Sequence, residues 1–136
     1  MNMRLVDWDQ RLVAVIAEHQ SRPFAWGEAD CAALFAAAVA AVTGRDPLAA
    51  FRPWASEHDA LRRLAGTGAP SVVAWVAERF DEIVPADARR GDVGYAAEAE
   101  MLSFPAIIVG ALAMSRNAEG WIIIPRARIV RAFKVG

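Results

Sequence analysis

Cys31, the chain's single cysteine, directly follows Asp30 at the start of an apolar segment that runs to Gly44. Asp30 is a favoured N-cap residue, because its carboxylate accepts hydrogen bonds from the free N–H groups of a first helical turn. Gly44 is a favoured C-cap residue. The pattern predicts a helix over residues 31–43 with Cys31 as its first residue, where the helix dipole favours the thiolate. This placement suits a cysteine nucleophile.

A nucleophilic thiol also needs a base within hydrogen-bond reach and a group that orients this base. The chain has two histidines. His58 lies in the polar stretch 56–59, which predicts an exposed helix start. His19 falls on the apolar face of a predicted helix, so it is either a buried structural histidine or a weak candidate for the base. Asp30 is a poor substitute, since its negative charge would raise the pKa of the thiol.

Helical patterns occupy the first half of the chain, about residues 7–82. Asp7 and Gln10 form a capping-box pattern before a first helix that ends at Pro23. The second helix, 31–43, is apolar nearly all round and should be buried. Ser56 and Ser71 are candidate caps for two further helices, which we expect to end near Leu64 and Phe80.

Strand patterns occupy about residues 89–135. The segment 89–92 predicts a tight turn into a strand at 93–95. Apolar runs at 104–110 and 121–124 are separated by a predicted hairpin loop at 117–120, and a last strand is expected within 129–135. Helices followed by a small antiparallel sheet indicate an α+β fold.

Length and composition limit the functional classes. A chain of 136 residues is expected to form a single domain, 1–136, and its net charge of −1 gives no indication of nucleic-acid binding. One cysteine allows no internal disulfide, and no Cys/His cluster suggests a metal or cofactor site. The N-terminus lacks a signal-peptide pattern, and the apolar stretch 31–42 is too short to cross a bilayer. We therefore expect a soluble protein made in the cytoplasm, without membrane insertion.

Two short motifs, Asp30-Cys31-Ala32 and Arg90-Gly91-Asp92-Val93, resemble those of the papain-like cell-wall peptidases of the NlpC family. The resemblance covers about residues 24–125 and implies a papain-like fold, with N-terminal helices packed on a small C-terminal sheet or barrel. In that family a following strand carries the catalytic histidine in a His-Val-Gly-Ile type sequence. The equivalent stretch here, 105–110, contains no histidine.

The block from Arg22 to Cys31 and the tail from Arg131 to Val135 resemble a group of phage and prophage proteins. Genes of that group usually lie among tail genes, beside those for the tail tip. The resemblance implies that the protein, made in the host cytoplasm, enters the virion and binds other tail-tip proteins.

We interpret the protein as a structural or assembly component of a bacteriophage tail tip, with a degenerate peptidase fold. Cys31 would be a vestigial nucleophile, and Trp26, Asp30 and Asp92 would line its pocket or form the adjoining turn. The alternative is an active peptidoglycan-degrading cysteine peptidase that uses Cys31, with His19 or a partner's residue as base. A third hypothesis is a cytoplasmic chaperone or regulator of a tail protein.

Overall fold

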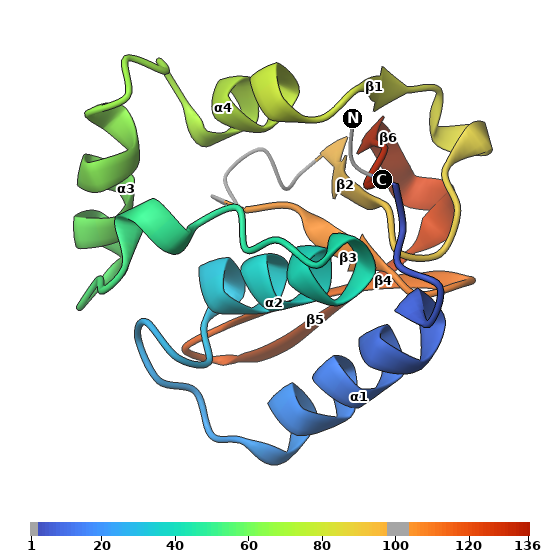
Figure 1. Cartoon of the computed structure of the whole chain (residues 1–136), viewed down its shortest axis with the longest axis horizontal. Helices are drawn as coiled ribbons and strands as arrows, with labels where there is room; N and C mark the ends of the chain where they lie inside the picture. The colour runs from blue at the N-terminus through green and yellow to red at the C-terminus, as the bar shows by residue number, and fades with distance from the viewer. Residues whose placement is uncertain (1–2, 98–103) are drawn as a thin grey trace.

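The computed structural model describes residues 3–97 and 104–136, in which four α-helices precede a six-stranded antiparallel sheet (Figure 1). The α+β prediction is thus confirmed. The helices are α1 (Trp8–Ser21), α2 (Cys31–Thr43), α3 (Glu57–Ala65) and α4 (Val72–Arg79). The strands are β1 (Glu82–Ile83), β2 (Val93–Ala96), β3 (Ala106–Ile108), β4 (Leu112–Asn117), β5 (Gly120–Pro125) and β6 (Ile129–Phe133).

The strands lie in the order β1-β6-β2-β3-β4-β5, so β1 and β5 are the two edges of an open sheet. β4 and β5 form a hairpin in which Asn117 pairs with Gly120, as the hairpin loop predicted at 117–120 requires. At the centre, β2 pairs with both β3 and β6. Gly94 allows this close packing, because a Cβ there would lie 2.7 Å from Cγ2 of Ile129.

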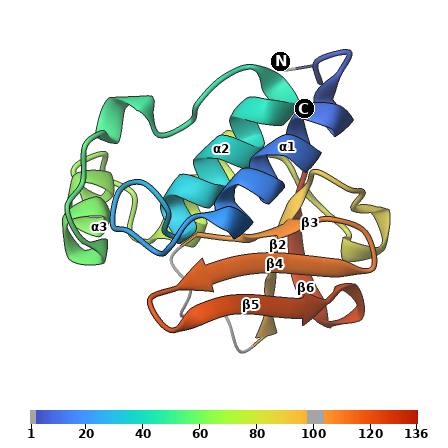
Figure 2. The same ribbon diagram turned by 90° about the horizontal axis from the view of Figure 1, so that it is seen from below.

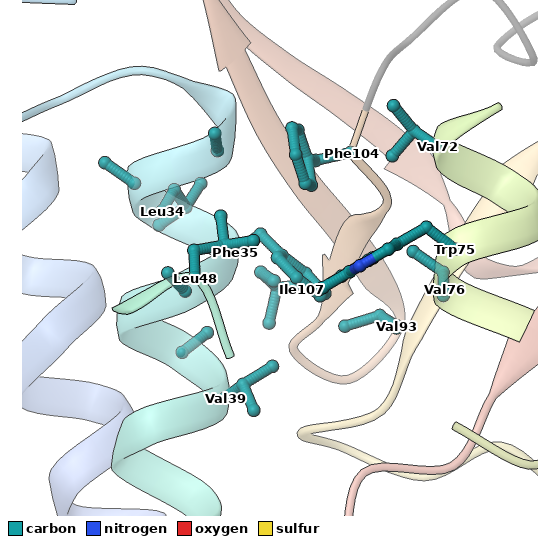
Figure 3. Close-up of a cluster of buried hydrophobic side chains, with 14 of the residues drawn as sticks. Leu34, Phe35, Val39, Leu48, Val72, Trp75, Val76, Val93, Phe104 and Ile107 are labelled. Atoms are coloured by element: carbon teal, nitrogen blue, oxygen red, sulfur yellow. The ribbon is translucent and has the colours of Figure 1, made fainter. Parts of the chain in front are cut away.

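Helix α2 is the centre of the main core. It lies beside α1 and packs on one face of the sheet, where it contacts β3 and β4 (Figure 2). Its many alanines allow close approach of neighbouring elements, and ten of its thirteen residues are buried, as its composition predicts. Figure 3 shows Phe35 of α2 pointing towards Trp75 of α4 and Ile107 of β3, and all three side chains are almost fully buried.

A second apolar cluster packs against the other side of the sheet. Alternate residues of β3 point to opposite sides, so Ile107 joins the main core and Ile108 joins the second cluster. The second cluster consists of small and branched residues contributed mainly by strands: Ala88, Ala96, Ala106, Ile108, Ala113, Ile124, Ile129 and Ala132. The sheet is therefore buried on both faces near its centre.

Several local predictions need correction. Asp7 precedes α1 but makes no side-chain cap bond; instead its carboxylate accepts a hydrogen bond from Nε of Arg11 at 2.8 Å. The capping-box prediction was wrong, since the Asp7 backbone is not in the extended conformation that an N-cap adopts. The sequence patterns also missed β1 and β4. β4 pairs with both β3 and β5, so the predicted 104–110 and 121–124 strands are not direct partners.

No helix within the described residues is both long and apolar enough to cross a membrane.

Candidate functional site

Asp30 fixes the backbone on both sides of Cys31. Its Oδ1 accepts a hydrogen bond from the backbone N–H of Ala33 at 2.7 Å, which confirms the predicted cap of α2. Its Oδ2 accepts bonds from the Gly27 backbone N–H at 2.7 Å and from Nε1 of Trp54 at 2.9 Å. With a side chain fully enclosed and three donors satisfied, Asp30 ties the loop before α2 to the segment before α3.

Gly27 is required by this arrangement. Its φ of +80° lies in the left-handed region, and a Cβ there would lie 2.4 Å from the backbone oxygen of Trp54. The segment from Trp26 to Cys31 is therefore a tight turn held against Trp54 rather than a loose loop.

The space beside Cys31 is too small for a substrate. It has a volume of about 10 Å³, and its walls include Trp26, Trp54, Leu61 and Phe104. A cavity needs roughly 10–15 Å³ of such volume to hold one water molecule. No histidine lines this space among the described residues. Residues 98–103, in the segment after β2, lie outside the described residues.

Phe104, from the segment that leads into β3, lines the space beside Cys31. It lies two residues before β3, is 2% exposed, and its ring centroid is 5.5 Å from that of Phe35. Figure 3 shows the Phe104 ring above Phe35 of α2, with Val72 of α4 on its other side. A phenyl ring can neither accept the thiol proton nor return one to a leaving group. The Phe104 side chain therefore supplies no proton acceptor to this space.

The pKa of the Cys31 thiol is raised from 9.0 to about 12, chiefly by burial and next by the negative charge of Asp30. Hydrogen bonding from the backbone of Phe104 and of Ala32 favours the thiolate to a smaller extent. A helix N-terminus contributes about 0.3–1 kcal/mol, which is less than one pKa unit. The expected effect of the helix dipole is thus outweighed, and the thiol stays protonated at neutral pH.

Tyr95 on β2 also lies near Cys31. Burial raises the pKa of its phenol, and the proximity of Cys31 raises it further. The side chain is 1% exposed and packs edge-on against Phe133, with ring centroids 6.3 Å apart. Its phenol therefore remains protonated and cannot serve as a base at neutral pH.

His19 lies in a different place from Cys31. It is 4% exposed and lines a separate cavity of about 300 Å³ with Ala33 and Ala37 of α2. Burial lowers the pKa of its imidazole, and the positive charge of Arg22 lowers it further. Its Nδ1 has no hydrogen-bond partner among the described residues. The candidate base thus lines a different cavity from the space that Cys31 lines.

Arg116 on β4 fixes the end of α1 where His19 lies. Its guanidinium donates to the backbone oxygens of His19 at 2.8 Å and Arg22 at 3.1 Å, and lies 4.5 Å from the ring centroid of Trp121. The side chain forms no ion pair among the described residues, although it is 5% exposed. The carbonyl oxygens at the negative end of the α1 dipole stabilise this buried cation.

Asp92 does not line the space beside Cys31. Its Oδ1 accepts bonds from Nη2 of Arg4 at 2.8 Å and from the Val135 backbone N–H at 2.9 Å. Its Oδ2 accepts a bond from the Arg89 backbone N–H at 2.9 Å, which closes the predicted 89–92 turn. Of the sequence-predicted site residues, Cys31, Asp30 and Trp26 therefore line one space, and His19 and Asp92 do not line it.

The remaining candidates have simpler environments. Trp26 is 42% exposed and packs edge-on against Phe24, with ring centroids 4.8 Å apart. His58 is exposed on α3, as its polar neighbourhood predicts. No group of three or more His, Cys, Asp or Glu side chains in the described part of the chain could hold a metal ion.

Sequence reasoning missed Phe104, Tyr95, Arg4 and Arg116. Phe104 directly precedes the stretch 105–110, which lacks the histidine of the NlpC family. This position was the one sequence signal that could have pointed to Phe104. The other three carry no local pattern, because their roles depend on partners far away in the sequence.

Residues 3–135 match the family described as a domain of unknown function, DUF6950. No curated protein matches the sequence.

Proposed function

The chain belongs to the DUF6950 family, and we propose that it is a structural or assembly component of a bacteriophage tail tip whose peptidase-like site is inactive. The phage context rests on the resemblance of the Arg22–Cys31 block and the Arg131–Val135 tail to phage and prophage proteins. The partners on this proposal are other proteins of the tail tip.

A degenerate papain-like fold is part of the same proposal. Two features of that fold family have counterparts here: a buried helix that begins at Cys31, and an Arg-Gly-Asp turn that leads into the antiparallel strands. The sheet is open, and the four helices precede its strands in the sequence. The proposed relationship therefore depends on the order of these elements and on the short motifs.

The small space beside the half-buried Cys31 carries the argument against catalysis. The sulfur has about 10 Å³ of space beside it, and Phe104 forms part of the wall. Amide hydrolysis by a thiol requires a base to accept its proton and an acid to protonate the leaving amine, and this help is worth about 10²–10⁴-fold in rate. The raised pKa of Cys31 further reduces the thiolate available for attack.

Purified phage particles provide the test of the structural role. We expect the protein to be present in washed virions at a constant copy number, and Cys31→Ala phage to form tails and infect as the wild type does. Absence of the protein from particles would contradict a virion component and support a chaperone or regulator that leaves before assembly is complete. Loss of infectivity in Cys31→Ala phage, with normal tails, would favour the peptidase.

A further inference from the structure

The strand β5 is an edge of the sheet with an unusual composition. It reads Gly-Trp-Ile-Ile-Ile-Pro from Gly120 to Pro125, and within the described residues it pairs with β4 alone. Ile123 is 51% exposed. Natural edge strands are commonly protected from pairing by short length, a lysine, a bulge or a central proline. The other edge, β1, has only two residues, whereas β5 has six and carries no charge.

The register of the hairpin shows which backbone groups of β5 point outward. The N–H of Arg126 donates to the oxygen of Ala111 at 2.9 Å, just beyond the last pair, Leu112 with Pro125. Because hydrogen-bonded and non-bonded pairs alternate in an antiparallel ladder, the even-numbered residues of β5 bond to β4. The N–H and C=O groups of Trp121 and Ile123 are therefore directed away from the sheet.

We propose that β5 is a self-association edge, which pairs antiparallel with β5 of a second copy of this chain. In the pairing that uses these outward groups, Trp121 of each copy lies opposite Ile123 of the other. Four N–H···O=C bonds then satisfy both outward N–H groups of each strand. The exposed Ile123 side chain is covered by an indole ring, a favourable cross-strand pair.

Charges at the two ends of β5 favour this orientation and this occupant. Glu119 precedes the strand, Arg128 follows it, and both are exposed. Neither forms an ion pair among the described residues. Antiparallel pairing of two copies places Glu119 of each strand opposite Pro125 of the other, at the end of the strand that continues to Arg128. Parallel pairing would place like charges together, so the strand is complementary to itself only when reversed.

Sedimentation velocity on the full chain tests the proposal. A single strand pair is a small interface, so we expect a reversible equilibrium between about 10 µM and 1 mM. The average mass should rise with concentration from 14.7 kDa towards that of a dimer. Ile123→Pro removes an N–H that the chain's own sheet does not use, and should weaken association about tenfold or more.

Ile123→Lys and Val130→Lys form a matched pair, since both native side chains are 51% exposed but Val130 lies on the inner strand β6. Ile123→Lys should weaken association while Val130→Lys leaves it unchanged, and circular dichroism confirms that each variant is folded. A monomer at every concentration would overturn the proposal. A strand from a different protein would then be the remaining candidate to pair with β5. Equal weakening by both lysines would overturn it as well.

Discussion

A cysteine at the start of a helix is subject to two opposing influences. The dipole stabilises a thiolate by a fraction of a pKa unit, whereas enclosure by apolar groups destabilises it far more. At Cys31 burial prevails, because the side chain packs beside Trp54 and Phe104 and Asp30 adds a negative charge next to the sulfur. Position on a helix alone therefore does not make this cysteine reactive.

Alkylation kinetics measure this balance. With a thiol pKa raised to about 12, we expect native Cys31 to react with iodoacetamide at pH 8 at least about a hundredfold more slowly than the same chain in urea. The native rate should continue to increase about tenfold per pH unit above pH 9, since the thiolate fraction does so below the pKa. A native rate that reaches a plateau below pH 9 would show an activated thiol instead.

The buried imidazole of His19 should make the free energy of unfolding depend on pH. Because burial lowers the pKa of His19, the unfolded chain binds a proton near pH 6.5 that the folded chain does not. The stabilisation is complete above this pH and is lost as pH falls through the lower folded pKa. Urea unfolding should show a decrease in the free energy of unfolding between pH 7 and pH 5 that is absent in His19→Gln. An identical pH dependence in the two proteins would refute this assignment.

At the scale of elements, the N-terminus of α2 is a junction rather than a simple cap. One carboxylate, that of Asp30, holds the start of α2, the Gly27 turn and the Trp54 indole together. The caps of α3 and α4 are simpler, since Ser56 and Ser71 each accept one bond from the first turn of their own helix. The structure therefore offers matched caps with one and with three bonds.

Alanine replacements should lower the free energy of unfolding more at the three-bond cap than at the one-bond caps. We expect Asp30→Ala to lower the free energy of unfolding by about 3 kcal/mol, because buried donors on Gly27 and Trp54 lose their partner. Ser56→Ala and Ser71→Ala should each lower it by about 1 kcal/mol, as ordinary caps do. Chemical denaturation with one fitted slope for all variants gives the comparison. Equal effects in all three would mean that Asp30 acts as a cap only.

The limits of the sequence analysis are clearest in two strands. The helices 31–43 and 57–65 were predictable because caps and apolar periodicity are local signals. β4 was not, because Ser115 and Arg116 interrupt its apolar pattern although both are buried in the fold. Arg116 is buried because α1 supplies two carbonyl oxygens. The meeting of Cys31 with Phe104 likewise depends on how α2 packs on the sheet, which no spacing of residues encodes.

For the whole molecule, Arg4 joins three distant segments. Its guanidinium binds Asp92 at 2.8 Å, the Arg90 oxygen at 2.7 Å and the Val135 oxygen at 3.0 Å. It also lies 4.3 Å from the ring centroid of Trp8. The segment before α1, the turn before β2 and the segment after β6 are thus closed by one nearly buried ion pair.

Mutation of this pair should reveal strong coupling. Arg4→Met and Asp92→Asn should each lower the free energy of unfolding by about 3 kcal/mol, because each leaves a buried polar partner unsatisfied. The double variant should be more stable than the sum of the two losses implies, by about 1–3 kcal/mol. The exposed pair of Arg11 with Asp7 is the control and should contribute less than about 1 kcal/mol. Additive losses for Arg4 and Asp92 would show that they act independently.

The central proposal, that Cys31 lies beside a space too small for a substrate and is not catalytic, is tested most directly by digestion of purified peptidoglycan. Wild-type protein and Cys31→Ala are incubated with the substrate, alone and with purified tails, and soluble stem-peptide fragments are measured by mass spectrometry. We predict that the two proteins release the same background amount. Fragments released by the wild type and lost in Cys31→Ala would contradict the claim.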